Sequence, residues 1–183
     1  MQAPITKEEA IQVANNTIGP TAAIFMDSII EKPYGWYFTF QSKEFVESGN
    51  QDVMWMGIGY EFLVENPGGR VINFGTQFGA NYNLAAYEAG LKYEVYNLYI
   101  LSVNDMEQTV DALTDLQMIY VIPTLENNVV WKIPNRYSRT EIAEILSSLP
   151  VGFTKQRLNN NLHIFDTINK LKCCVYKLTE HKD

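Results

Sequence analysis

Residues 31–42 read Glu-Lys-Pro-Tyr-Gly-Trp-Tyr-Phe-Thr-Phe-Gln-Ser, and this stretch is the most informative of the chain. Pro33 and Gly35 favour a tight turn, because proline fixes φ and glycine accepts unusual backbone angles. After the turn every second residue is a large aromatic, and the side chains of a strand alternate between its two faces. The pattern predicts a strand with three inward core residues, Trp36, Phe38 and Phe40, which alternate with Tyr37, Thr39 and Gln41.

Around this strand the sequence predicts a first unit over residues 1–92. Thr6 and Glu9 have the spacing of a capping box, and Gly19-Pro20 ends the helix that they begin. A strand is expected over residues 21–30. Two further strands are expected over residues 60–64 and 70–74, and a hairpin turn at residues 66–69 joins them. A short helix follows over residues 81–90. We therefore expect an N-terminal helix, a four-stranded antiparallel sheet and a second helix.

Residues 93–183 are expected to form a second small α/β sandwich-like unit, to which the sequence assigns no role. Its strands are predicted over residues 96–103, 118–122, 129–133, 151–158 and 173–178. Three helices alternate with them, and capping residues mark their starts: Asn104 with Glu107, Ser138 with Glu141, and Asn161. The order βαββαβαβ favours an antiparallel or mixed sheet with helices on one face, so the whole chain is predicted to be α+β.

The composition favours a folded protein with an acidic surface. Of the 183 residues, 46% are hydrophobic and 19% are charged, and the net charge is −7. A negative surface repels phosphate groups, so neither nucleic acid nor an anionic membrane is expected as a partner. The sequence shows no secretory signal, no run near the ~20 apolar residues of a membrane span, and no disulfide framework. We therefore expect a cytoplasmic protein.

The sequence shows no recognisable catalytic or cofactor motif. His163 and His181 have no visible partner for acid–base chemistry, and the adjacent Cys173-Cys174 should point to opposite faces of a strand. Neither glycine-rich stretch, residues 57–59 or 67–69, matches a phosphate-binding loop. We expect no enzyme activity, no cofactor and no metal site. A hydrolase with a carboxylate pair is the remaining catalytic hypothesis, with candidates Glu44, Glu47, Glu61 and Glu65.

Residues 52–59, Asp-Val-Met-Trp-Met-Gly-Ile-Gly, are unusually apolar for a connection between two strands. Either the segment folds under the sheet as core, or it presents an adhesive loop to a partner. We favour the core interpretation, because buried aromatic residues are commoner than displayed ones. For a bound partner, we expect the contact on the face that carries Glu44, Glu47, Trp55 and Tyr60.

Residues 4–92 resemble the immunity protein 35 family of bacterial polymorphic toxin systems. The resemblance rests on the order and spacing of several segments: residues 6–10, 31–38, 41–42, 45–50, 57–60 and 71–76. It implies a protein that binds a cognate toxin and blocks it, with a toxin domain as partner and no catalytic residues of its own. Domains of this family usually stand alone, whereas a second unit follows here.

Two functions compete on this reading of the sequence. The preferred hypothesis is a non-enzymatic immunity-type protein that neutralises a bacterial toxin through an acidic and aromatic surface, because complementary charge speeds encounter with a basic toxin. The alternative is a general protein-interaction or chaperone-like module, in which residues 31–42 only build the sheet.

Overall fold

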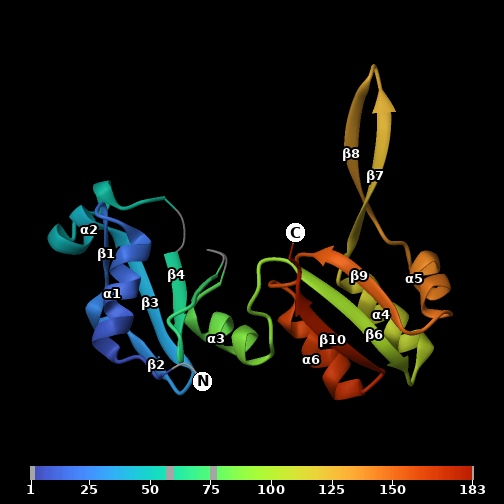
Figure 1. Cartoon of the computed structure of the whole chain (residues 1–183), viewed down its shortest axis with the longest axis horizontal. Coiled ribbons are helices and arrows are strands. Elements are labelled where there is room, and N and C mark those ends of the chain that lie inside the picture. Colours follow the sequence, from blue (N-terminus) through green and yellow to red (C-terminus); the bar gives the residue numbers. More distant parts are fainter. Residues whose placement is uncertain (1–2, 57–59, 75–77, 183) are drawn as a thin grey trace. The chain divides into compact units, whose positions relative to one another are not determined.

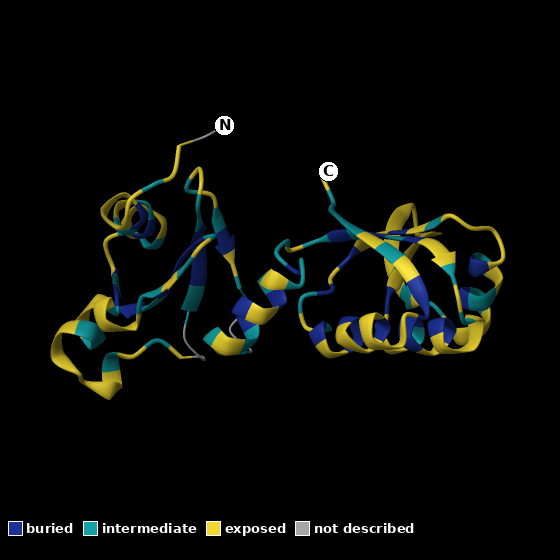
Figure 2. Cartoon of the chain, turned by 90° about the horizontal axis from the view of Figure 1, so that it is seen from below, coloured by how far each residue is buried: buried dark blue, intermediate teal, exposed yellow. Residues whose placement is uncertain are grey.

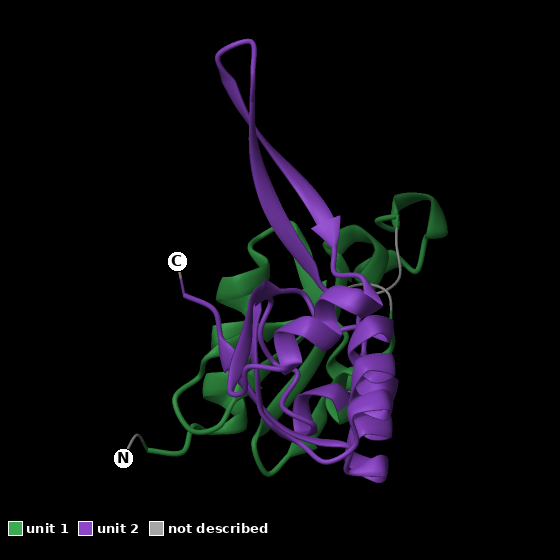
Figure 3. Cartoon of the chain, turned by 90° about the vertical axis from the view of Figure 1, so that its right-hand side faces the viewer, with its two compact units in different colours: residues 1–85 green, residues 86–183 purple. Residues whose placement is uncertain are grey.

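A computed structural model describes residues 3–56, 60–74 and 78–182, and these ranges contain six α-helices and ten strands. The fold class is α+β, as the sequence predicts. The chain divides into two compact units, residues 1–85 and 86–183 (Figure 3). The division falls within a helix that ends before the expected boundary at residue 92.

Unit 1 opens with helix α1, Lys7–Ile18, and the predicted capping box is confirmed (Figure 1). Thr6 Oγ1 accepts a hydrogen bond from the Glu9 N–H at 3.2 Å, and a Glu9 carboxylate oxygen accepts one from the Thr6 N–H at 2.7 Å. An antiparallel sheet follows, with β1 (Ala22–Ile24), β2 (Ile30–Lys32), β3 (Gly35–Ser42), β4 (Tyr60–Glu65) and β5 (Val71–Asn73). Helix α2 (Lys43–Ser48) follows β3, and α3 (Ala80–Glu88) follows the sheet.

The prediction of one strand over residues 21–30 is wrong. The segment forms β1, a 3₁₀ turn over Met26–Ser28, and β2, and both strands pair with β3. The turn is closed by Ser28, whose N–H and Oγ donate to the Phe25 carbonyl at 3.0 and 2.8 Å. This local bonding competes with the strand ladder, so the sheet has five strands and not four.

Strand β3 lies at the centre of unit 1. Trp36 and Phe38 belong to the buried core against α1, and Phe40 packs at its margin, so the predicted inward face is confirmed. The other face of β3 is covered as well, because Tyr37 and Gln41 are also buried. The alternation of residue types indicated only one buried face.

Unit 2 has the predicted order of elements, βαββαβαβ. The strands are β6 (Tyr96–Val103), β7 (Ile119–Glu126), β8 (Val129–Arg136), β9 (Val151–Gln156) and β10 (Cys174–Glu180), and the helices are α4 (Met106–Asp115), α5 (Arg139–Leu146) and α6 (Leu162–Leu171). Strands β10, β6 and β9 form an antiparallel sheet in that order. Figure 2 shows the helices of unit 2 on one side of this sheet. The core lies between them and includes Tyr96, Leu98, Ile100, Leu113, Ile142, Phe153, Phe165 and Ile168.

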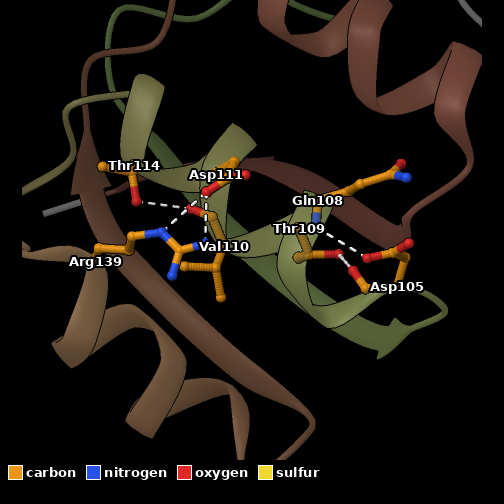
Figure 4. A network of polar contacts seen from close by, with 7 residues as sticks. All are labelled: Asp105, Gln108, Thr109, Val110, Asp111, Thr114 and Arg139. Atoms are coloured by element: carbon orange, nitrogen blue, oxygen red, sulfur yellow. Dashed lines mark hydrogen bonds and ion pairs between the residues drawn. The ribbon is translucent and has the colours of Figure 1, made fainter.

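Helix α4 is capped by Asp105 and not by the predicted Asn104. The Asp105 carboxylate accepts a hydrogen bond from the Gln108 N–H at 3.0 Å (Figure 4). Asn104 instead donates through Nδ2 to the Lys172 carbonyl at 2.8 Å, which ties it to the start of β10. Asn104 and Asp105 are adjacent and both can cap a helix, so the sequence spacing does not show which of them caps α4.

The other predicted helix starts in unit 2 fare differently. Ser138 and Glu141 form the predicted capping box, with Ser138 donating its N–H to Glu141 at 2.7 Å. Asn161 stands at the N-cap of α6 but makes no side-chain capping bond there. Arg139 also contacts Asp111 of α4 at 2.8 Å, so the ion pair in Figure 4 joins the first turn of α5 to α4.

Strands β7 and β8 pair with each other and not with the three-stranded sheet. They form a hairpin that projects from unit 2 (Figures 1 and 3), and we call residues 119–136 the arm. Its strands are longer than the predicted residues 118–122 and 129–133. Asn127 and Asn128 have φ values of 50° and 61°, as a two-residue hairpin turn requires.

Candidate interaction surfaces

The connection between β3 and β4 is fastened to the end of β3 by two buried polar residues, Gln41 and Ser42. The Gln41 side chain pairs with the backbone of Trp55: its Oε1 accepts from the Trp55 N–H at 2.9 Å, and its Nε2 donates to the Trp55 carbonyl at 3.3 Å. Ser42 Oγ donates to the Val53 carbonyl at 2.6 Å and accepts from the Phe45 N–H at 3.2 Å. These bonds hold both α2 and the following loop in place.

Several side chains on this fastened connection remain exposed. Met54 and Met56 are 41% and 92% exposed, whereas Trp55 is half-buried and packs edge-on against Tyr60 with ring centroids 5.6 Å apart. The core interpretation of residues 52–59 is therefore wrong for the two methionines, and residues 57–59 lie outside the described residues. A loop with a held backbone and exposed apolar side chains is suited to bind a partner.

The residues predicted to bind a partner divide into two pairs. Glu44 and Glu47 are exposed on α2, and Glu47 lies 3.7 Å from the Lys43 ammonium. Trp55 and Tyr60 form the ring pair, in which Tyr60 also contacts Phe40. No hydrogen bond or ring contact described in unit 1 joins the acids to the aromatic pair. Glu44, Glu47 and Trp55 lie within the segment that follows Ser42, and we call residues 43–56 the 43–56 surface.

An open cleft of about 660 Å³ adjoins the 43–56 surface. It lies beside the end of α1 and along β1, and Lys43 belongs to both the cleft and the surface. Its other lining residues include Asn15, Asn16, Pro20 and Met26, a mixture of amide and apolar groups. A partner that contacts α2 therefore meets a concave region beside it.

A buried polar cluster on the other face of β3 was missed from the sequence. Asn83 of α3 donates through Nδ2 to the Tyr37 hydroxyl at 2.8 Å, to a Glu61 carboxylate oxygen at 2.7 Å and to the Phe78 carbonyl at 3.1 Å. Tyr37 donates its hydroxyl to the same carboxylate. Burial, followed by the interactions with Glu61, raises the pKa of Tyr37 well above its ordinary value. The cluster ties α3 to the sheet, because its donors and acceptors satisfy one another.

Among the described residues of unit 2, the histidines and cysteines lie apart from one another or are buried without a recognisable catalytic partner. His163 is exposed beside a cavity of about 300 Å³, and His181 Nδ1 lies 3.0 Å from Asn97 Oδ1. Cys173 and Cys174 are buried, and burial raises the pKa of Cys174 to about 12, so its thiol stays protonated. Within the described ranges no three residues among His, Cys, Asp and Glu gather as a metal site.

No family model, curated protein or solved structure matches this chain. The resemblance to the immunity protein 35 family therefore stays a prediction. In the part of the chain that the structure describes, no helix has both the length and the apolar character needed to cross a membrane.

Proposed function

We propose that this chain is a non-enzymatic, immunity-type protein that binds and neutralises a bacterial toxin domain in the cytoplasm. The observation that supports the proposal best is the exposure of Met54 and Met56 on a loop whose backbone Gln41 and Ser42 hold in place. Exposed apolar side chains on a pinned backbone lose little further freedom on binding, so more of the contact energy remains for affinity.

The charge of the 43–56 surface suits a basic partner. This segment contains Glu44, Glu47 and Asp52 against the single cation Lys43. Both glutamates are exposed, so they can steer a positively charged toxin surface toward the methionines and Trp55. Methionine adapts its shape to the surface it meets, and this complements the directional charge of the glutamates.

The buried cluster in unit 1 supports a role without catalysis. Glu61 is one of the four glutamates proposed for a catalytic pair, but it is engaged by Tyr37 and Asn83. A carboxylate bound by two structural donors and placed against the sheet serves packing better than proton transfer. We therefore assign Glu61 to the architecture of unit 1.

The test first asks whether a toxin domain is encoded beside this gene, and then measures the binding of that domain to the full chain by titration calorimetry. We expect binding, and we expect Glu44→Lys with Glu47→Lys to weaken it at least tenfold, because two charges change sign at the contact. Glu144→Lys, on the exposed face of α5 in unit 2, is the matched control and should bind as the original chain does. Equal affinity for the double variant and the control would exclude the 43–56 surface.

The exposure of Met56 also favours a second candidate function, a chaperone-like module. Exposed methionines suit promiscuous recognition of apolar segments. The two functions differ in their ligand, so the same calorimetry with reduced, unfolded α-lactalbumin distinguishes them. Binding of this model protein, lost in Met54→Ser with Met56→Ser and retained in Glu44→Lys with Glu47→Lys, would favour the chaperone-like module.

A further inference from the structure

The arm carries apolar side chains that nothing described in unit 2 covers. Residues 121–134 are all exposed, and eight large apolar residues of the arm are 39% to 70% exposed. They are Ile119, Val121, Ile122, Leu125, Val129, Val130, Trp131 and Ile133. An isolated two-stranded hairpin is at best marginally stable in water, so an arm of this composition favours a covering partner.

Both faces of the arm are apolar, whereas its edges are protected. Thr124 pairs with Trp131 and Leu125 pairs with Val130, and successive pairs point to opposite faces. Pro123 lies within β7 and Pro134 within β8, and a proline offers no N–H to a further strand. The arm is therefore suited to bind through its side chains and resists extension of its ladder by another strand.

The base of the arm is held firmly to the body of unit 2. The buried Gln156 side chain accepts from the Ile119 N–H at 2.9 Å and donates to the Ile119 carbonyl at 2.7 Å. Tyr120 donates its hydroxyl to Glu141 at 3.0 Å and stacks near Tyr137, with ring centroids 4.6 Å apart. These contacts fix the direction in which the arm leaves the body.

Unit 2 also has an uncovered sheet face. Its helices pack on one side of β10, β6 and β9, and Leu101 and Val175 are exposed on strands of this sheet. Tyr99 lies flat against β9, since a Cβ atom on Gly152 would come within 2.9 Å of its ring. Tyr99 alternates with the buried Leu98 and Ile100 along β6, so it belongs to the face away from the helices. Leu101 lies where the register between β6 and β10 shifts, and its side chain is 46% exposed.

The charge of the arm complements the rest of the chain. It contains Lys132 and Arg136 against Glu126, a net charge of +1, whereas the whole chain carries −7. The rest of unit 2, residues 86–118 and 137–183, contains eleven Asp and Glu against eight Lys and Arg, a net charge of −3, so unit 2 of a second copy offers a negative body to each arm.

The available area also favours a second copy. Full burial of a large apolar side chain removes about 100 Å² from water, so the four half-exposed apolar side chains on one face of the arm offer about 200 Å². Apolar atoms make up a little more than half of a typical interface, so one face of the arm offers about 350 Å² in all. One arm with the surface it covers would bury about 700 Å², the scale of a weak contact, whereas two exchanged arms would bury about 1,400 Å², within the range of a specific interface. A two-fold exchange contains the same arm-to-sheet contact twice.

We propose that the arm docks on the open sheet face of unit 2 in a second copy, and that two copies exchange arms in a two-fold dimer. This assembly uses surfaces distinct from the 43–56 surface and does not depend on the proposed function.

Analytical ultracentrifugation of the full chain between about 1 and 100 µM tests the proposal. We expect a concentration-dependent dimer, and we expect Leu125→Ser with Trp131→Ser, which alters both arm faces, to make the chain monomeric. Leu101→Asp on the sheet face should do the same. Leu171→Asp is the matched control, because Leu171 lies at the end of α6 and is 47% exposed against 46% for Leu101. All these positions are exposed, and circular dichroism checks that each variant folds.

A mixture of the arm variant (Leu125→Ser with Trp131→Ser) and the sheet variant (Leu101→Asp) distinguishes arm exchange from stacking of two arms on each other. In the exchange, the intact arm of Leu101→Asp can dock on the intact sheet of the arm variant, so the mixture should form a weak heterodimer. A chain that stays monomeric at 100 µM would overturn the proposal. A Leu101→Asp variant that dimerises as tightly as Leu171→Asp would overturn it as well, and would favour arm-on-arm stacking.

Discussion

The 43–56 surface of unit 1 and the arm of unit 2 are both exposed apolar segments held by a buried glutamine. Gln41 pairs with the N–H and carbonyl of Trp55, and Gln156 pairs with the N–H and carbonyl of Ile119. In each case the side-chain amide makes the two backbone hydrogen bonds that a neighbouring strand would make to that residue. The same device therefore fixes two segments whose side chains remain open to solvent.

The two segments differ in the chemistry that they expose. The 43–56 surface presents methionines and acidic residues, which adapt to and attract a foreign basic protein. The arm presents mainly Val and Ile, whose β-branched side chains are stiff and suit one complementary surface. This difference leads us to assign the first surface to a different protein and the second to another copy of this chain.

Replacing the two glutamines should have the largest effect on the two exposed segments. Gln41→Met and Gln156→Met keep the side-chain length but leave the Trp55 or Ile119 backbone groups without their partner, at a cost of about 1–3 kcal/mol in the stability of the unit concerned. Native-state hydrogen exchange resolves the two units. Gln41→Met should weaken toxin binding only, and Gln156→Met should weaken dimerisation only; loss of both properties in either variant would show that the surfaces are not independent.

Asn83 offers a test of a buried amide that anchors no exposed segment. Asn83→Ala removes the donor shared by Tyr37 and Glu61, and should lower the free energy of unfolding of unit 1 by about 1–2 kcal/mol. Dimerisation and toxin binding should keep their original constants at a temperature where the variant is folded. A change in either constant would extend the binding surfaces to the covered face of β3.

Alkaline pH should destabilise unit 1 through Tyr37. Burial raises the pKa of Tyr37 above its ordinary value of 10, so the unfolded chain releases this proton first. The stabilisation is complete below about pH 10 and is lost as the pH rises above it, at up to about 1.4 kcal/mol per pH unit. Tyr37→Phe should flatten this part of the stability profile in urea unfolding, whereas Tyr60→Phe, at a half-exposed position, serves as the control. If the free energy of unfolding falls with pH at the same slope in the original chain, Tyr37→Phe and Tyr60→Phe, Tyr37 is not the cause of the pH dependence.

The smallest effect concerns the N-cap of α4. Asp105→Ala should cost about 1 kcal/mol in the stability of unit 2, because the first turn of α4 loses the acceptor for the Gln108 N–H. Dimerisation should be unchanged, since the Gln156 contacts remain. Asn104→Ala removes a bond to Lys172 and no cap, so α4 should keep its first turn in hydrogen exchange. Equal fraying of the first turn of α4 in both variants would contradict the assignment of the cap to Asp105 alone and would favour the predicted cap, Asn104.

The regular elements could be predicted because their signals are local. The capping boxes at Thr6 and Ser138, the alternation around Phe38 and the order of elements in unit 2 all depend on neighbouring residues. The break at Ser28 was missed, because a side-chain bond within the turn outweighed a strand-like pattern.

The candidate surfaces could be predicted only in part. Glu44 and Glu47 were correctly expected at an exposed position, since charged residues avoid burial. The exposure of Met56 fits the adhesive-loop alternative and not the favoured core interpretation. The exposure of the arm could not be predicted, because the same apolar pattern also fits a covered strand. The roles of Gln41 and Gln156 as anchors could not be predicted, since their partners are backbone groups 14 and 37 residues away.

Hydrogen exchange of the full chain at two concentrations, about 1 and 100 µM, tests the central claim most directly. The account predicts that amides of the arm and of β6 exchange more slowly at the higher concentration, while those of residues 43–56 and β3 do not change. Exchange in the arm that is independent of concentration, or equal slowing in the arm and in residues 43–56, would contradict it.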